Sequence, residues 1–376
     1  MTTEMTYNDF SWRLAAQYLH GSNMNSCISP PGIFLLSSAI AAASQDLTKE
    51  ELDFVLGGKA LQDISDGDHF ANIRRLNDMI AQCSVLSNDT AMSIPDVYHL
   101  LPEYRDKLKE SFDEKLKIGS SSDDAVVLEN IIVFQDSWKY SFEETTEMFY
   151  KTPYTSSEYM FRSFENLFED IVSTMPLCNL TSKDTTEAKG QRIPYIHQEE
   201  TSGIRVQESE EFISVAVPFS SDCHMVFSMP KNRPLDECLG DSSFLRRALD
   251  ISTGRPAMID LYLPSFKIKN RLDLIPILTA MGAKEVFDKE DGQITKMVND
   301  RLYIESGNQE TEVEVTVKGA YARALTRFRM TKAISGMSFY SPPKVVRFNH
   351  PFLFAIWQSE PTPVPLFIGT FQNPDK

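Results

Sequence analysis

The 376-residue chain lacks the short motifs that accompany most catalytic and cofactor sites. It contains no Gly-x-Ser-x-Gly elbow, no Walker phosphate loop, no Gly-x-Gly-x-x-Gly dinucleotide motif and no His-Glu-x-x-His zinc motif. Its six histidines are scattered along the chain, and none forms a pair at a metal-ligand spacing. These absences predict a protein that is not an enzyme, with no catalytic or metal-ligating residue and no cofactor.

Long apolar runs and a surplus of basic charge are also missing. No window reaches the ~18 apolar residues of a membrane span, and 53 acidic against 37 basic residues give a net charge of −16. This balance argues against a nucleic acid or an anionic membrane as partner. The beginning of the chain has neither a basic region nor an apolar run, so no signal peptide is expected. We therefore expect a cytoplasmic protein, with leaderless release as the alternative.

Cysteine is scarce, with five residues at positions 27, 83, 178, 223 and 238. The number is odd and no Cys-x-x-Cys spacing occurs, which is not the pattern of a disulfide framework. In a protein that stays in the cytosol these cysteines are expected to be buried, reduced thiols.

Hydrophobic periodicity predicts several elements. Ile33–Ala43 is apolar nearly all round, as in a helix buried behind a sheet. Thr48, with Glu51 three residues later, has the spacing of a capping box and predicts a helix start before Leu52–Leu56. The largely apolar run Val126–Phe134, which is rich in β-branched residues and is interrupted by Glu129 and Asn130, predicts a central strand that is covered on both faces.

Two further regions have the patterns of strands. Phe212–Pro218 and His224–Met229 predict a strand pair. The segment Glu312–Val317 alternates strictly, with Val313, Val315 and Val317 on one side, and predicts a half-buried strand that leads into Gly319.

The stretch that follows this strand is depleted in acidic residues. No Asp or Glu occurs from Val315 to Ser359, although acids outnumber bases in the whole chain. A locally basic segment joined on both sides to strand-like apolar runs predicts a presented loop, and binding residues are often placed on such loops.

The end of the chain carries a family resemblance. Arg347–Phe354, followed by Pro365–Phe371 and Asn373-Pro374, is similar to the C-terminal signature of the serpins. Four earlier segments, in the family's order, resemble its N-terminal strand and helix, its central strand, its later strands and the helix after them: Asn25–Pro30 with Ile33, Leu128–Thr146, Leu261–Ile268 and Met281–Phe287.

The resemblance implies one α+β domain over residues 1–376, with a large central mixed β-sheet, two smaller sheets, about eight to nine helices and an exposed reactive-centre loop at about 318–343. Two departures are visible. Only a short Ser/Asp segment lies between Ile118 and Leu128, where serpins carry a helix across the front of the main sheet. An atypical insertion at about 162–193 contains an apolar stripe at helical spacing, and we hypothesise that it covers the surface left bare.

The implied function is suicide inhibition of a serine protease by a monomeric protein. The protease cleaves the loop, an acyl-enzyme forms, and the freed hinge inserts into the main sheet as a strand. The hinge is Gly319, Ala320, Ala322 and Ala324. The arginines from Arg323 to Arg329 all fall in the opposite alternation class, so the inward class is small or apolar and can enter the sheet without burying a charge.

The hinge also departs from inhibitory relatives. Ala320 replaces their usual Thr, and Tyr321 and Arg323 interrupt the run of Ala. A non-inhibitory serpin-like binding protein or chaperone is therefore the alternative function, and inhibition of cysteine proteases by the same loop is a third.

The resemblance also marks the place where the main sheet opens. Relatives typically have two Ser, an Asn and a His there. This chain has Ser29 and Asn130, but Gly32 and Gln309 occupy the other two positions. Gln309 can still form hydrogen bonds, but the pH dependence of opening should differ from that of a relative with His.

The bond offered to the protease stays open among several candidates, Lys332, Ala333, Ile334, Met337 and Ser338. Lys332 suits a trypsin-like protease with a carboxylate in its specificity pocket, and Ala333 suits an elastase-like one. The pair Met337-Ser338 suits a chymotrypsin-like protease, but needs a hinge four residues longer than usual.

Overall fold

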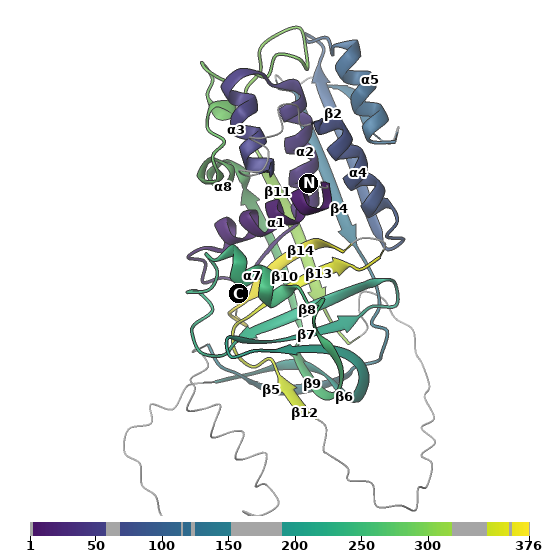
Figure 1. Cartoon of the computed structure of the whole chain (residues 1–376), viewed down its shortest axis with the longest axis vertical. Coiled ribbons are helices and arrows are strands. Elements are labelled where there is room, and N and C mark those ends of the chain that lie inside the picture. Colours follow the sequence, from purple (N-terminus) through teal and green to yellow (C-terminus); the bar gives the residue numbers. More distant parts are fainter. Residues whose placement is uncertain are drawn as a thin grey trace, which may run out of the picture.

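The computed structural model describes residues 3–57, 68–113, 116–121, 125–151, 190–317, 344–360 and 363–375. Within these residues seven α-helices and one short 3-10 helix occur, close to the expected eight to nine. The helices are α1 (Thr3–Leu19), α2 (Pro30–Ala43), α3 (Asp46–Gly57), α4 (His69–Ala81), α5 (Pro102–Ser111), α7 (Ser242–Leu249), α8 (Leu274–Met281) and η2 (Glu285–Phe287). Figure 1 shows α1 to α5 gathered at one end of an elongated molecule.

The largest sheet has nine strands and forms the other end of the molecule (Figure 1). Its order is β1 (Ser26–Ile28), β14 (Val364–Phe371), β13 (Phe352–Gln358), β8 (Cys223–Pro230), β7 (Phe212–Pro218), β6 (Gln191–Glu208), β9 (Arg255–Pro264) and β12 (Lys344–Arg347), with β5 (Glu143–Phe149) paired to β6. The β9–β12 pair is parallel, so the sheet is mixed, as expected. The predicted strand pair at Phe212–Pro218 and His224–Met229 is confirmed as β7 and β8.

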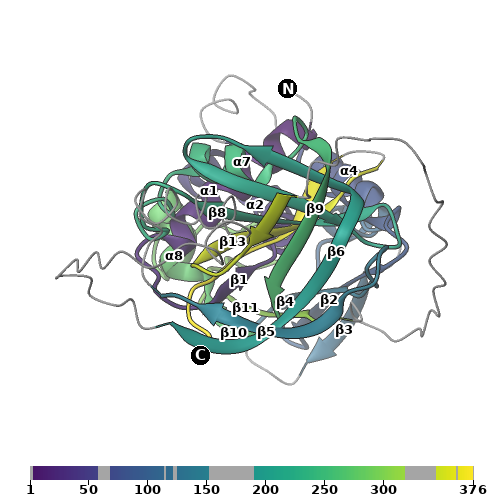
Figure 2. The same ribbon diagram turned by 90° about the horizontal axis from the view of Figure 1, so that it is seen from below.

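Two smaller sheets complete the α+β fold. One has the order β3 (Lys117–Ser121), β2 (Leu86–Pro95) and β4 (Val127–Phe134), and the other pairs β10 (Phe266–Asp273) with β11 (Asn308–Val315). β4 and β11 lie next to each other in both views (Figures 1 and 2). Within the described residues, however, no strand pairing joins them. The expected large mixed sheet with two smaller sheets is therefore confirmed, and β4 and β11 belong to the two smaller sheets.

The residues of the C-terminal signature form the centre of the core. Phe352 and Phe354 on β13 and Phe371 on β14 surround Phe266 of β10, with ring centroids 5.0–6.1 Å apart. Gly369 is required here, because a Cβ at this position would lie 2.3 Å from the Ser26 carbonyl oxygen and 2.4 Å from the ring of Phe354. The signature therefore specifies the packing of β13 and β14 against β1 and β10.

Two of the predicted elements are confirmed. Ile33–Ala43 lies in α2, where Ile33, Phe34 and Leu35 are buried. Residues 312–315 of the alternating segment lie in β11, where Val313 and Val315 are buried while the acids beside them are exposed. The strand ends at Val315, so Val317 lies after it and not within it as expected.

The predicted capping box at Thr48 and Glu51 is wrong. α3 begins two residues earlier, at Asp46. The Thr48 hydroxyl donates to Glu285 Oε2 (2.7 Å), and Glu51 Oε2 accepts the backbone N–H groups of Lys284 and Glu285 at 2.7 Å each. The spacing was that of a capping box, but long-range partners at η2 use these side chains.

The prediction that Val126–Phe134 is covered on both faces is also wrong. Alternate side chains of β4 point to solvent, and Ile131 and Val133 are 60% and 51% exposed. The described residues between β3 and β4 contain no helix that could cover this face. The exposed side of β4 thus carries Ile131 and Val133 beside Glu129.

Of the insertion expected at about 162–193, the structure describes residues 190–193. Gln191–Ile193 begin β6 and pair with β5, so the insertion ends before Gln191. The apolar stripe, and with it the hypothesis that the inserted segment covers the bare face of β4, lies outside the described residues.

Candidate functional site

The candidate site lies where β4 and β11 face each other without pairing. The segment that follows β11 contains the hinge and the bond candidates, and all of these residues lie outside the described part of the chain: Gly319, Ala320, Ala322, Ala324, Lys332, Ala333, Ile334, Met337 and Ser338. The two ends of that segment and the three sheet-opening residues Ser29, Asn130 and Gln309 are described.

Trp138 holds the beginning of the segment. Its indole Nε1 donates to the carbonyl oxygen of Thr316 (2.8 Å), directly after β11. Its ring is stacked on Phe219, with centroids 4.5 Å apart and planes 7° apart. Because Trp138 follows β4 by four residues, β4 and β11 end at the same place and run in the same direction. A strand that turned back after β11 would be antiparallel to both.

Glu208, at the end of β6, holds the other end of the segment. It accepts hydrogen bonds from Lys231 Nζ (2.6 Å) and from Nζ of Lys344, the first residue of β12. Burial raises the pKa of this carboxyl group, but the hydrogen bonds from the two lysines outweigh burial and lower the pKa to about 2. Glu208 is therefore ionised at neutral pH and ties the chain after residue 343 to β6.

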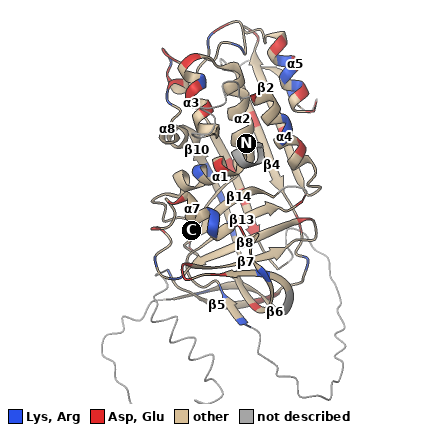
Figure 3. Cartoon of the chain, in the orientation of Figure 1, with Lys and Arg blue, Asp and Glu red and all other residues tan. Residues whose placement is uncertain are grey.

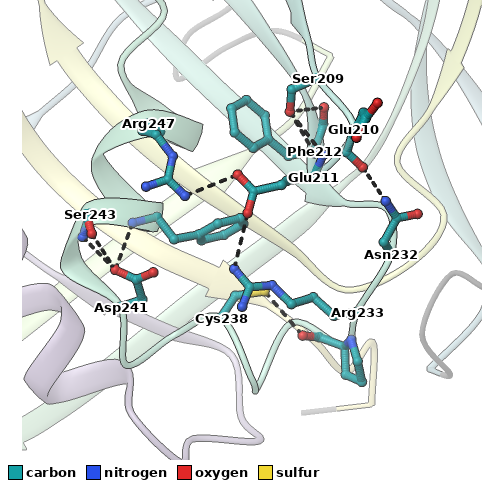
Figure 4. Close-up of polar contacts among 12 residues, drawn as sticks. Ser209, Glu210, Glu211, Phe212, Asn232, Arg233, Cys238, Asp241, Ser243 and Arg247 are labelled. Atoms are coloured by element: carbon teal, nitrogen blue, oxygen red, sulfur yellow. Dashed lines mark hydrogen bonds and ion pairs between the residues drawn. The ribbon is translucent and has the colours of Figure 1, made fainter.

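The turn after Glu208 is fixed by its own polar contacts (Figure 4). Glu211 lies between two arginines, with Oε2 accepting from Arg247 Nη2 (3.1 Å) and Oε1 3.7 Å from Arg233 Nη2. Asn232 donates to the carbonyl oxygen of Glu210. These contacts connect the β6–β7 turn to the chain after β8 and to α7, so the anchor at Glu208 stands on a packed support.

Ser29 and Gln309 form a two-way contact between the start of α2 and β11. Gln309 Oε1 accepts the backbone N–H of Ser29 (2.9 Å), and Gln309 Nε2 donates to the Ser29 carbonyl oxygen (2.7 Å). The Ser29 hydroxyl donates to the carbonyl oxygen of Leu366 (2.9 Å) and does not cap α2. One amide side chain thus satisfies both backbone groups of Ser29.

Asn130 on β4 contacts both β2 and the start of α2. Its Nδ2 donates to Asn88 Oδ1 (2.7 Å) and to Thr90 Oγ1 (2.9 Å), both on β2. Its Oδ1 is buried without a hydrogen-bond partner and faces Gly32 of α2, where a Cβ would lie 2.5 Å away. The Gly at position 32 therefore provides the space that Asn130 occupies.

The first turn of α2 thus contacts both sides of the opening, β11 through Ser29 and β4 through Gly32. The structure brings the three residues identified from the sequence to one place. It adds Asn88 and Thr90, which sequence analysis missed. Their signal was the alignment of β2 against β4, in which Thr90 is directly opposite Asn130, and that alignment could not be read from one strand alone.

Other chemistry is limited in the described part of the chain. No group of three or more His, Cys, Asp or Glu residues there has the geometry to hold a metal ion. Among the same residues no helix is both long and apolar enough to cross a membrane. Figure 3 shows acidic and basic residues side by side on α3 and α5.

Comparisons with known proteins identify relatives of the whole fold. A family model described as Serpin (serine protease inhibitor) matches residues 182–374, just over half of the chain. Antitrypsin of Bombyx mori is 30% identical over 165 residues, which cover 42% of this chain and 40% of that protein. Serpin B3 of Homo sapiens is 28% identical over 279 residues, 72% of this chain and 60% of the relative. The chain therefore matches about two fifths to three fifths of the length of these relatives.

Solved structures match over nearly the full length. Human kallistatin has a TM-score of 0.74 at 16% identity, covering 100% of this chain and 99% of that one. Human thyroxine-binding globulin complexed with thyroxine has a TM-score of 0.74 at 16% identity, covering 99% and 98%. At this identity the two structures are evidence of a shared fold.

The close approach of Gly32 and Asn130 can be tested by substitution. Gly32→Ala should lower the free energy of unfolding by about 1–2 kcal/mol. Asn130 would have to move away from Asn88 and Thr90, and this loss exceeds the gain of about 1 kcal/mol from the helix propensity of Ala. The measurement is urea unfolding of Gly32→Ala, Asn130→Ala and the double variant. The cost of the double variant should be smaller than the sum, since without Asn130 nothing opposes the new methyl group.

Gly119→Ala is the matched control, because a Cβ at Gly119 meets nothing within 4 Å. It should leave stability nearly unchanged. If Gly32→Ala behaved like this control, or if the two site substitutions were additive, Asn130 would not occupy the space beside Gly32.

Proposed function

Because the chain belongs to the serpin family, we propose that it is a single-use inhibitor of serine proteases that inserts its cleaved loop between β4 and β11. One observation carries this proposal. β4 and β11 run in the same direction (Figure 1) and are not paired with each other, and the segment that contains the hinge begins after β11. Each protease acylated by its own cleavage reaction would be carried away on the inserted strand.

The energetics favour insertion. β4 and β11 each have eight residues, so a strand between them would form ladders on both of its sides. At about 1 kcal/mol net for each backbone hydrogen bond, the gain is on the order of 10 kcal/mol before apolar burial is counted. This gain must be released faster than water hydrolyses the acyl bond.

Charges beside the opening fit the alternation of the hinge. The exposed positions of β11 include Glu310, Glu312 and Glu314, whereas the opposite side carries Gln309 and the buried Thr311, Val313 and Val315. In the inserted strand, Ala320, Ala322 and Ala324 would face inward. Arg323 and Arg327 would face outward on the same side as these acids, where opposite charges on neighbouring strands attract each other.

The protease is of the trypsin-, elastase- or chymotrypsin-like type, according to which bond is cleaved. Antitrypsin and antichymotrypsin-2 of Bombyx mori, both 30% identical over about two fifths of the chain, carry names consistent with such targets. The loop from Lys318 to Lys332 has five bases and no acid. Its charge would steer acidic protease surfaces towards it, an effect that salt weakens.

The second candidate is a non-inhibitory serpin-like binding protein. It is favoured by the hinge, where Ala320 replaces Thr and Tyr321 and Arg323 interrupt the run of Ala. Thyroxine-binding globulin, whose fold matches, is a structure with a bound small molecule. For such a protein, loop cleavage would leave thermal stability unchanged.

Thermal stability separates the two candidates. Cleavage of the loop should raise Tm by about 10 °C or more, since ~10 kcal/mol of new interactions is large against the unfolding entropy of a chain of this size. The measurement is thermal unfolding before and after limited proteolysis, with the cleaved fragments confirmed on a denaturing gel. An unchanged Tm would favour the binding protein.

The cleaved bond can be located in the same reactions. With trypsin-, elastase- and chymotrypsin-type proteases, the mass of the released C-terminal peptide should place the cut between Lys332 and Ser338 in whichever reaction gives a detergent-stable complex. A complex whose peptide begins before Lys332 would contradict this alignment of the loop, because the remaining hinge would be too short to carry the protease. A cysteine-protease panel tests the third function.

The alternation of the hinge has its own test. Ala322→Glu should convert the protein from inhibitor to substrate, because inserting the strand would bury a carboxylate at a cost of several kcal/mol. Leu325→Glu is the matched control, with the same new charge in the outward class. The yield of detergent-stable complex should fall at least tenfold for Ala322→Glu and stay near the parent value for Leu325→Glu. Equal yields for the two variants would show that the alternation is assigned wrongly.

A further inference from the structure

Two cysteines that are distant in sequence lie in contact near the end of β4, where Leu86, three residues after Cys83, is paired with Phe134. The Sγ atoms of Cys83 and Cys223 are 3.2 Å apart, and the two side chains are 7% and 3% exposed. Both are free thiols, as are Cys27 and Cys238, which confirms the expected buried thiols for the described cysteines. Cys178 lies outside the described residues. Nothing in the inhibition of a protease requires this pair.

Each cysteine belongs to a different part of the fold. Cys83 is in the turn between α4 and β2, and its carbonyl oxygen accepts the backbone N–H of Leu86 (3.1 Å), the first residue of β2. Cys223 begins β8 and is aligned with Gln358 of β13. The pair therefore spans from the β3–β2–β4 sheet to the nine-stranded sheet.

The contact suits oxidation. A disulfide has an S–S distance of about 2.05 Å, so the sulfur atoms need to approach by about 1 Å. The hydrogen bond with Cys223 lowers the pKa of the Cys83 thiol, and the same contact raises the pKa of Cys223. Cys83 is taken as the thiol that reacts first, because the residues that follow it line a surface hollow.

A route for a small oxidant lies beside Cys83. A surface hollow of about 500 Å³ is lined by residues 84–87, by Val133 and by residues 135–137. Its wall begins at Ser84, directly after Cys83, so the hollow brings solvent next to the segment that carries this thiol.

We propose that Cys83 and Cys223 form a reversible disulfide that fastens the β3–β2–β4 sheet to the nine-stranded sheet and thereby blocks insertion of the loop. The oxidant is a peroxide. The Cys83 thiolate attacks one oxygen of hydrogen peroxide and the O–O bond breaks. Hydroxide departs as the leaving group, and Cys83 becomes a sulfenic acid. The Cys223 sulfur then attacks the Cys83 sulfur, the S–O bond breaks, and water leaves with the Cys223 proton. In sum, two thiols and one hydrogen peroxide give one disulfide and two waters, and a small thiol such as dithiothreitol reverses the bond by exchange.

The block follows from which sheet has to move. Neighbouring strands in a sheet are about 4.8 Å apart. After a strand has been placed between β4 and β11, the distance between these two strands must therefore be about two such spacings. β11 and its partner β10 are fixed to β1 of the nine-stranded sheet, because Asn270 and Thr311 bind the backbone of Cys27. The sheet that contains β4 must therefore do most of the moving.

At the hollow the contacts between this sheet and the nine-stranded sheet are non-covalent. Trp138 is stacked on Phe219, and the backbone N–H groups of Lys139 and Ser220 donate to the carbonyl oxygens of Pro218 (3.0 Å) and Ser137 (2.8 Å). The Ser221 hydroxyl donates to Asp136, and the hydroxyls of Ser137 and Ser220 are 3.0 Å apart. Such contacts are worth about 1 kcal/mol each and yield to the gain from insertion. A disulfide allows a displacement of a fraction of an ångström before it is strained, and it does not yield.

The disulfide is tested first, by chemistry alone. A Cys178→Ser background removes the cysteine that the structure does not describe. Treatment of the folded protein with hydrogen peroxide should lower the thiol count by two and give a tryptic peptide pair joined through Cys83 and Cys223. Cys27 and Cys238 should remain thiols. Adding Cys223→Ser, or Cys83→Ser if that variant folds better, should abolish the joined pair. Oxidation without this pair would overturn the proposal, whatever the protein does to proteases.

The block, which rests on the proposed function, is tested second. Reduced protein should gain Tm on loop cleavage and form the detergent-stable complex, whereas oxidised protein should form less than one tenth of the complex until dithiothreitol restores it. Cys223→Ser should be insensitive to peroxide. Full complex formation by a protein whose Cys83–Cys223 bond is confirmed by mass would refute the block. If the Tm of the reduced protein did not rise on cleavage, the proposed function and the block would both be refuted. The disulfide itself would still be tested separately by the peptide masses.

Discussion

The structure depends on two strand edges, those of β4 and β11, that face each other without forming a ladder. An unpaired edge is normally a liability, because its N–H and C=O groups invite another strand. Here the chain that leaves β11 is long enough to supply that strand itself. The first turn of α2, the indole of Trp138 and the salt bridge at Glu208 all lie where the edges, or the ends of the missing strand, must be held. In the proposed inhibition mechanism, this unsatisfied pairing would drive insertion of the loop, and the surrounding contacts would hold the edges apart until the loop is cleaved.

Gly32 and Gln309, the two residues that differ from the family pattern at the opening, each fit the residue that they contact. Gly32 leaves room for Asn130, which is thereby held against Asn88 and Thr90 of β2. Gln309 offers one donor and one acceptor to the backbone of Ser29. A neutral imidazole could do the same, but it loses its acceptor on protonation near pH 6.5. The amide keeps both bonds across that range, so this contact holds the opening equally well on either side of neutral pH.

Sequence reasoning succeeded where a pattern has one structural outcome. The alternation at Val313 and Val315 produced β11, and the apolar run after Pro31 produced a buried helix, because each pattern matches the period of its element. Sequence reasoning failed where residues distant in the sequence determine the partners or the burial of a side chain. Thr48 and Glu51 had capping-box spacing but bind η2, and Val126–Phe134 was apolar enough for two covered faces although Ile131 and Val133 are exposed. The resemblance identified Ser29, Asn130 and Gln309, whereas Asn88 and the contact of Cys83 with Cys223 depend on strand register and packing that no local pattern encodes.

The proposed insertion of the loop requires that the contacts across the opening are weak. Two hydrogen bonds from Gln309, one from Trp138 and the packing of Asn130 on Gly32 amount to a few kcal/mol at ~1 kcal/mol for each hydrogen bond. Insertion gains on the order of 10 kcal/mol on the same scale. In the proposed mechanism the uninserted state would therefore persist because of a kinetic barrier, not because it is the more stable state. Stronger non-covalent contacts at the edges would then slow insertion, which has to be faster than hydrolysis of the acyl bond. A covalent bond that forms and breaks with the redox state avoids this conflict, since it adds nothing to the barrier in the reduced protein. That is the physical reason why a thiol pair at the back of the moving sheet is a better place for control than further hydrogen bonds at its edge.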